Sequence, residues 1–420
     1  MSDNLNPPDA IIIGGGIGGL SCAVGLSRKG VRVRLYEKSA EFGEVGAGLQ
    51  LAPNCTRILN DYGLLAEAVK LGVVPERMRM LDALEGDELT SLDLGDAEKR
   101  YGFPYLVMHR SDLHGLLLRE ARRLGVELIT SADCTGYENL PDGARVRFAS
   151  GAIDQGEVVI AADGLHSVAR RLLAYDEPVN SAYVAYRGAV PFEAVTENEI
   201  FDKDVVVYVG PRCHFVQYPL RGGKMFNQVA VFESPKALAG IEDWGTPDEL
   251  DAAFEGKCPP IRKGLPLMWR DRWWRMFDRD PIMNWVNGRI ALLGDAAHPP
   301  LQYMAQGAIM AIEDGWVLAE HVARQAPRRT GHSSGIDWDT ALTAYEAVRP
   351  EHCRRVVETA RNWGGLWHLD TNKREQRNAI LRSRDTYDYS FVDWIFGPTA
   401  LTPDQEPEPY QAIPLDPVKA

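Results

Sequence analysis

One segment, residues 10–38, constrains the fold of this chain more than any other. Its first part, Ile11–Ile13, predicts a buried strand because three β-branched residues follow one another. Three glycines in G-x-G-x-x-G order come next: Gly14, Gly16 and Gly19. Apolar residues then recur at helical spacing over 20–28, and residues 31–36 alternate like a second strand that Glu37 closes. The segment therefore predicts a strand–turn–helix–strand unit.

The spacing of these residues indicates dinucleotide binding. Gly14 makes the tight turn, Gly16 lets the backbone approach a pyrophosphate, and Gly19 lets the helix pack on the strand. The helix N-terminus offers unpaired N–H groups to the phosphates, and Glu37 would accept hydrogen bonds from ribose hydroxyls. The alternative is a glycine-rich turn in an ordinary βαβ unit. This unit alone does not decide between FAD and NAD.

Three later segments bear on that choice. Residues 43–54, GEVGAGLQLAPN, form a glycine-rich stretch. In residues 158–173 a buried strand runs into an Asp-Gly pair at Asp163. In residues 288–322 a strand ends in a Gly-Asp pair at Asp295, a proline-rich loop follows, and a long helix is predicted after it.

Together these motifs resemble the single-component FAD-dependent aromatic hydroxylases, the group that contains 4-hydroxybenzoate and salicylate hydroxylases. The resemblance extends to about residue 390 and implies non-covalently bound FAD. It implies that Glu37 and the glycines hold the ADP half, that Asp163 serves FAD and the pyridine nucleotide, and that Asp295 contacts the ribityl chain. It implies further FAD contacts at Lys38, Gly48, Gln50, Arg110, Pro300, Gly307 and Ala308. Without the resemblance, an arginine at a helix start such as Arg110 is as typical of a solvated surface charge as of a cofactor contact.

The predicted fold class is α/β, with a Rossmann-type FAD-binding domain, an inserted, mostly antiparallel β-sheet substrate domain and C-terminal helices. The FAD-binding domain is expected from residues 1–75, 104–178 and 272–325. The substrate-binding sheet is expected from residues 76–103 and 179–271. Residues 326–397 are expected to be helical, and the proline-rich residues 398–420 to form a loose tail.

The resemblance also implies a reaction. NADH, with NADPH as the alternative, would reduce FAD, and O₂ would then form a C4a-hydroperoxide that hydroxylates a phenolic aromatic acid. The ring reacts best as a phenolate, and water must stay out of the pocket. No metal is needed for this chemistry, and no His or Cys follows His298 at the spacing of a metal ligand. His298 is more typical of loop packing than of catalysis.

The proton acceptor is expected in the inserted sheet. His214, Val216 and Tyr218 stand at i, i+2 and i+4, so a strand would point all three to one face. The pKa of histidine suits a general base, and a His–Tyr relay could deprotonate a substrate phenol. The alternative is that both are ordinary half-buried strand residues.

Within the family, this segment is most similar to 3-hydroxybenzoate 6-hydroxylases, together with the motifs VAYRG, NQVAVFESP, DRWW and DAAHPPLQY. That resemblance implies that His214, Tyr218 and Gln302 contact the substrate, and that the product is gentisate, 2,5-dihydroxybenzoate. Salicylate 1-hydroxylation and 6-hydroxynicotinate 3-hydroxylation stay open. The large apolar residues Trp273, Trp274, Trp363 and Trp367 are more typical of core or subunit contacts than of substrate stacking.

Composition narrows the possible partners and location. The net charge is −13, so a nucleic-acid partner is not expected. Six scattered cysteines, a polar N-terminus and short apolar runs predict a cytoplasmic protein without a transmembrane segment. A homodimer is expected.

Other classes of function fit less well. A dehydrogenase that used only the N-terminal unit would leave the Asp-Gly and Gly-Asp motifs without a role. A redox sensor would need a recognition element, and the sequence has no basic patch or DNA-reading helix. A flavin-dependent halogenase would need a Trp-x-Trp-x-Ile-Pro segment, which is absent.

Overall fold

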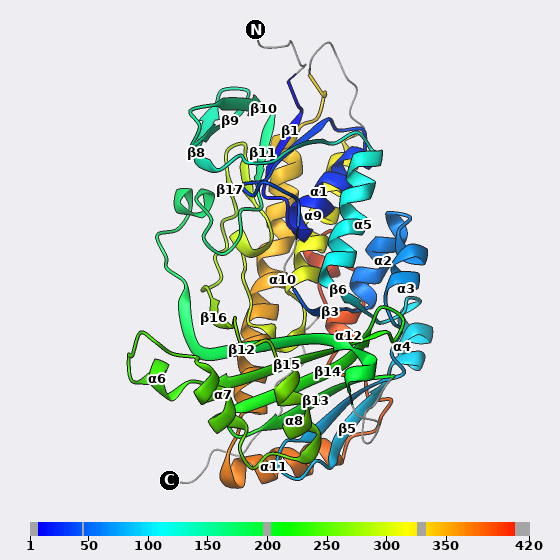
Figure 1. The fold of residues 1–420 in the computed structure, drawn as a ribbon. Coiled ribbons are helices and arrows are strands. Elements are labelled where there is room, and N and C mark those ends of the chain that lie inside the picture. Colours follow the sequence, from blue (N-terminus) through cyan, green and yellow to red (C-terminus); the bar gives the residue numbers. More distant parts are fainter. Residues whose placement is uncertain (1–6, 44–45, 196–202, 326–332, 408–420) are drawn as a thin grey trace.

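Two β-sheets, one above the other in Figure 1, organise the molecule. The computed structural model describes residues 7–43, 46–195, 203–325 and 333–407. Helices lie beside the upper sheet, and the longest helix runs alongside both sheets (Figure 1).

The first sheet is the Rossmann-type sheet that the N-terminal glycines predict. Its strand order is β17-β18-β11-β1-β2-β7, and its pairs are parallel except β17 with β18. The strands are β1 (Ala10–Ile13), β2 (Val33–Tyr36), β7 (Glu127–Ile129), β11 (Val158–Ala161), β17 (Val286–Asn287) and β18 (Ile290–Leu292). Ile11, Ile12 and their neighbours are buried because parallel strands have covered faces.

Three helices pack together beside this sheet: α1 (Ile17–Arg28), α5 (Arg110–Arg123) and α9 (Gly307–Arg324). Helices α1 and α9 approach closely at Gly315, where an added Cβ would lie 2.7 Å from the backbone of Cys22. This close contact places the N-terminal ends of both helices at the same cavity.

The second sheet has the strand order β16-β12-β15-β14-β13-β4-β5, and its pairs are antiparallel except β4 with β13. Its strands are β4 (Arg77–Asp82), β5 (Glu88–Asp93), β12 (Val179–Pro191), β13 (Asp204–Gly210), β14 (Cys213–Leu220), β15 (Met225–Glu233) and β16 (Trp274–Asp278). The expected boundary at 271/272 is therefore wrong by one strand, because β16 pairs with β12 as the edge of this sheet.

Successive side chains along these strands point to opposite faces of the sheet, one toward a hydrophobic core and the other toward a cavity. Phe215 of β14 packs with Phe254 and Ile261 from two short helices in a second hydrophobic core. His214 and Val216 point the other way and line a cavity between the two domains. The helices over the core face are α6 (Pro235–Leu238), α7 (Pro247–Phe254) and α8 (Pro259–Gly264).

Smaller elements complete the fold. The remaining strands are β3 (Gly48–Leu51), which pairs with β6 (Leu106–His109), and β8 (Cys134–Leu140), β9 (Gly143–Phe148) and β10 (Ile153–Gly156), which form a three-stranded sheet. The remaining helices before residue 325 are α2 (Pro53–Asp61), α3 (Leu65–Leu71) and α4 (Leu94–Tyr101).

The C-terminal region connects the two domains. Helix α10 (Trp338–Trp367) contacts α9 and β17, and its C-terminal end reaches β14 through His368. Helix α11 (Thr371–Arg382) packs on β5, and α12 (Asp393–Phe396) on α2. No helix in the described ranges has the length and apolarity needed to cross a bilayer.

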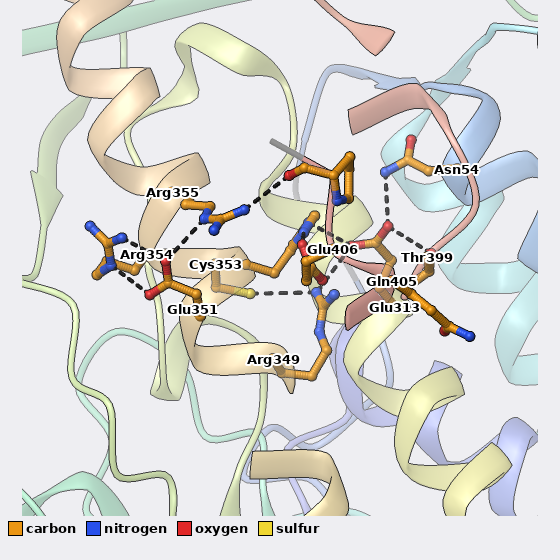
Figure 2. A network of polar contacts seen from close by, with 12 residues as sticks. Asn54, Glu313, Arg349, Glu351, Cys353, Arg354, Arg355, Thr399, Gln405 and Glu406 are labelled. Atoms are coloured by element: carbon orange, nitrogen blue, oxygen red, sulfur yellow. Dashed lines mark hydrogen bonds and ion pairs between the residues drawn. The ribbon is translucent and has the colours of Figure 1, made fainter. Parts of the chain in front are cut away.

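The first part of the expected loose tail is held in place, which corrects that expectation. Figure 2 shows the buried polar network responsible. The Glu313 carboxylate accepts hydrogen bonds from Asn54, Arg349 and Thr399, and His352 lies 3.0 Å from Glu406. Buried charges need such partners, so residues 399–406 are part of the packed structure. Residues 408–420 lie outside the described residues.

Candidate active site

A cavity of about 660 Å³ lies between the two domains. Its wall combines the glycine turn of the first sheet, the inner face of the second sheet and the C-terminal end of α10. Segments far apart in the sequence therefore build one site.

The N-terminus of α1 forms part of this wall. The helix begins at Ile17, Gly16 precedes it without a side-chain cap, and both line the cavity. Gly14 has a φ of 110°, and an added Cβ would lie 2.1 Å from the Ala162 carbonyl oxygen. A Cβ on Gly19 would lie 1.9 Å from the Gly14 carbonyl oxygen. The turn thus offers uncapped N–H groups to the cavity, and these fit a pyrophosphate.

Two predicted acidic residues lie behind the wall. The Glu37 carboxylate accepts hydrogen bonds from the N–H groups of Gly15 and Ser39, both at 2.8 Å, and Lys38 beside it is exposed. Asp163 accepts hydrogen bonds from Tyr137 at 3.0 Å and from the Val168 N–H at 2.9 Å. Asp163 does not line the cavity, so in this structure its carboxylate holds the turn that presents Gly164.

The other predicted cofactor residues meet at the cavity. Asp295 and Pro300 line it from the loop after β18, and Gly307 and Ala308 line it from the first turn of α9. From the other side it is lined by Gly48, Gln50 and Arg110. Their contacts with FAD stay predictions.

His214 is the central ionisable group of the second sheet's inner face. It is 1% exposed, and Gln302 lies 3.4 Å from its Nε2 atom. On the opposite side of the ring, Nδ1 lies 2.8 Å from Nε2 of His368. Burial, together with His368, lowers the pKa of His214 well below its ordinary value. The imidazole is therefore neutral at pH 7 and can accept a proton.

Tyr218 packs directly on the backbone of β3. An added Cβ at Gly48 would lie 2.4 Å from Cε2 of Tyr218, so only glycine leaves room for the ring. Burial raises the pKa of Tyr218 well above its ordinary value, and the positive charge of Arg187 only partly offsets this effect. Tyr218 therefore stays protonated and can act as a hydrogen-bond donor.

The structure does not bring His214 and Tyr218 into direct contact, and a relay that involves both stays a prediction. The two residues stand four positions apart on one strand, roughly 13 Å along its axis. The hydrogen-bond partners of the His214 ring are His368 and Gln302. The shared face was predicted correctly, but a shared face does not bring i and i+4 into contact on a strand.

Sequence reasoning missed Arg187, which also lines the cavity. Its guanidinium forms no hydrogen bond or ion pair with any described residue, and it lies 5.5 Å from the centre of the Trp274 ring. Burial lowers the pKa of Arg187, with Arg110 adding to the effect. A cation without a protein counter-ion in a cavity suits an anionic ligand. The available signal was an arginine within the otherwise apolar strand sequence VAYRGAV.

The sequence favours packing roles for His298 and for the four tryptophans. His298 lies 2.6 Å from Asp314, stacks on Trp285 and does not line the cavity, which agrees with a packing role. The expectation of core contacts is confirmed for all four tryptophans, which belong to or pack against the two hydrophobic cores. Three of them also line the cavity, because it extends to the edge strand β16 and the end of α10. The three that line it are Trp274, Trp363 and Trp367.

Comparisons with known proteins agree with this geometry. The family model described as an FAD binding domain matches residues 8–360. A 3-hydroxybenzoate 6-hydroxylase from Polaromonas naphthalenivorans is 36% identical over 406 residues, 94% of this chain and 98% of the relative. The chain belongs to the FAD-dependent aromatic hydroxylases.

Two further proteins are similar to this chain over most of its length. A 6-hydroxynicotinate 3-monooxygenase from Bordetella bronchiseptica is 34% identical to this hydroxylase, over 93% of the chain and 95% of the relative. The structure of Klebsiella pneumoniae HpxO with FAD and uric acid has a TM-score of 0.78 at 28% identity, covering 91% of this chain and 95% of that one.

The expected family, enzyme class and fold are therefore confirmed. This hydroxylase is an FAD-dependent aromatic monooxygenase, with a Rossmann-type domain, a second sheet domain and C-terminal helices. The uncapped turn at Gly16 and the loop around Asp295 fit FAD. The sequence alone could place these cofactor loops, because each motif is local.

Proposed function

We propose that this hydroxylase converts 3-hydroxybenzoate to 2,5-dihydroxybenzoate, using NADH and O₂. The observation that carries the proposal is the pairing in one cavity of a neutral buried base, His214, with Arg187, a cation that has no counter-ion among the described residues. A phenolic acid offers a matching pair of groups, an acidic hydroxyl and a carboxylate.

The arrangement of these groups favours a meta relationship. Arg187 on β12 pairs with Val229 on β15, which pairs with Val216 on β14. Two strand spacings, about 10 Å, therefore separate the Arg187 backbone from that of β14. The hydroxyl and carboxylate of salicylate are adjacent, whereas those of 3-hydroxybenzoate lie apart on the ring and suit two separate partners.

Each side chain then has a distinct task. His214 accepts the phenol proton, Gln302 orients the same oxygen, and Arg187 holds the carboxylate. Tyr218, which stays protonated, donates a hydrogen bond. Bound FAD would take a hydride from the nicotinamide and activate O₂ for transfer of one oxygen atom to the ring. Apolar residues that line the cavity, such as Val216 and Val229, exclude water from the substrate ring that receives the oxygen atom.

The first test is turnover by the FAD-loaded enzyme. NADH oxidation and products are measured with 3-hydroxybenzoate, salicylate and 6-hydroxynicotinate. The proposal expects 2,5-dihydroxybenzoate from the first acid, with most of the NADH used for product. Preferred hydroxylation of either other acid would overturn the substrate assignment and leave the enzyme class intact.

The second test uses two variants, one expected to slow the hydroxylation step and the other expected to weaken substrate binding. His214→Asn removes the base and should slow hydroxylation by about 10²–10⁴-fold while flavin reduction continues. Arg187→Met should raise KM for 3-hydroxybenzoate by roughly 10- to 150-fold, since a charged hydrogen bond contributes about 1.5–3 kcal/mol. The matched control is 3-hydroxybenzyl alcohol, which has no carboxylate. An equal effect of Arg187→Met on both compounds would refute the role of Arg187.

Three further expectations are proposals of the same kind. They are a preference for NADH over NADPH, a homodimer and a cytoplasmic location. Initial rates with both nucleotides at subsaturating concentration test the first, and sedimentation of the holoenzyme tests the second.

A further inference from the structure

We propose that His368 is the second member of a two-histidine proton relay that carries the substrate phenol proton from His214 to solvent. This inference rests on the proposed function, because it assigns the route by which the proton leaves the base. His368 directly follows α10, and neither its position nor any motif marked it in the sequence.

The buried base His214 and the second histidine, His368, are in direct contact. His214 Nδ1 lies 2.8 Å from His368 Nε2, and the rings are nearly parallel, with an interplanar angle of 19°. His214 is 1% exposed and His368 is 8% exposed. His368 does not line the cavity, so its exposed part faces away from the substrate. The pair therefore leads from the buried site toward the outside.

The contact of Gln302 sets the direction of the hydrogen bond between the rings. Its amide nitrogen, 3.4 Å from His214 Nε2, can only donate, so Nε2 is the acceptor and the His214 proton is on Nδ1. Nδ1–H then donates to Nε2 of His368. Both imidazoles are neutral at pH 7, since burial lowers both pKa values, that of His368 to about 3.

The proton balance closes in three steps. The bound phenol takes the place of the Gln302 amide at Nε2 of His214, and its O–H bond breaks as the proton binds that nitrogen. The Nδ1 proton of His214 passes to Nε2 of His368, and the Nδ1 proton of His368 leaves to solvent. Both rings end neutral with exchanged tautomers, and no imidazolium persists in the buried site. Protonation of the product phenolate by the reverse steps restores the first tautomers.

The groups around His368 hold its ring in this position. Tyr183 of β12 stacks on it with centroids 4.6 Å apart, and Tyr303 meets it edge-on at 5.5 Å. Arg377 of α11 is the nearby cation, and it lowers the pKa of His368 further. A positive neighbour favours release of the proton to solvent over its retention on the ring.

The experiment measures the release of the substrate proton to solvent. FAD-loaded wild-type enzyme and its variants are mixed with 3-hydroxybenzoate in weak buffer containing a pH indicator, without NADH. The wild type should release a proton on binding. His368→Phe, which keeps an aromatic ring but no nitrogen, should slow release by about 10-fold or more. His368→Gln can still bond to His214 but cannot relay a proton, so it should be equally slow.

Turnover supplies the second readout. In both His368 variants the ratio of product to NADH should fall near pH 7 and recover as the pH approaches the ordinary phenol pKa of about 10, where the substrate is already ionised. Tyr183→Phe, which keeps the stacked ring, is the matched control and should behave as wild type.

The outcomes separate the two proposals. A wild type that hydroxylates 3-hydroxybenzoate, with unchanged proton release and coupling in both His368 variants, overturns the relay alone. Recovery of release by His368→Gln, or a loss of coupling that is equal at every pH, reduces His368 to support of His214 and also overturns it. A wild type that neither binds nor hydroxylates the acid overturns the proposed function, and the relay with it.

Discussion

Replacement of Gly48 by alanine should disturb the active site through the ring of Tyr218. The added Cβ would lie 2.4 Å from Cε2, 2.8 Å from the hydroxyl oxygen and 2.9 Å from Cζ of that ring. Tyr218 is 3% exposed, and the Gly48 N–H is held by the side chain of Asn227 at 2.7 Å. Neither the Tyr218 ring nor the Gly48 backbone can move away without breaking other buried contacts.

The size of the effect follows from this overlap. Extra atoms forced into a packed core cost about 1–3 kcal/mol, and a contact with ring carbons on a fixed strand belongs at the upper end of that range. Gly43→Ala, five residues earlier in the chain, is a matched control, since no atom of the described residues lies within 4 Å of its added Cβ. We expect Gly48→Ala to lower the free energy of unfolding by about 2–3 kcal/mol relative to Gly43→Ala.

The assay is denaturant unfolding of the FAD-loaded proteins, together with a double-mutant cycle. Tyr218→Ala removes the ring, so Gly48→Ala should add almost nothing in that background, with a coupling energy of about 2 kcal/mol. Equal stability of Gly48→Ala and Gly43→Ala would show that the ring does not pack on this backbone. A purely additive cycle would refute the reasoning in the same way.

Two further predictions concern the cofactor turn and acid stability. Gly14→Ala should lower the flavin content of the purified protein, because its φ of 110° is strained for alanine and the methyl group would meet the Ala162 carbonyl; flavin absorbance per protein measures this, and full occupancy would contradict it. Asp82, bonded to Arg374 and Asn378, has its pKa lowered to about 2, so its contribution of about 2 kcal/mol is complete above about pH 4 and is lost as the pH falls toward 2. Unfolding free energies measured between about pH 5 and 3 should therefore fall less steeply in Asp82→Asn than in wild type, and parallel curves would count against this ion pair.

The sequence by itself determined the elements whose signals are local. The strand, glycine turn and helix of residues 10–38 could be predicted from periodicity and spacing, and so could the Gly-Asp loop and the start of α9 at Gly307. The shared face of His214 and Tyr218 also followed from the two-residue period of a strand. In each case neighbours in the chain supply the constraint.

Only the tertiary structure decided what these side chains touch. His214 meets His368 across 154 residues, and Gly48 accommodates the ring of Tyr218 although the two belong to different domains. Arg187 has no counter-ion among the residues that the structure describes, because of what surrounds β12 in three dimensions. These contacts arise from the packing of two sheets and a long helix, and no local pattern encodes such packing. The sequence could therefore place the cofactor loops, while the route of the substrate proton depends on how the domains meet.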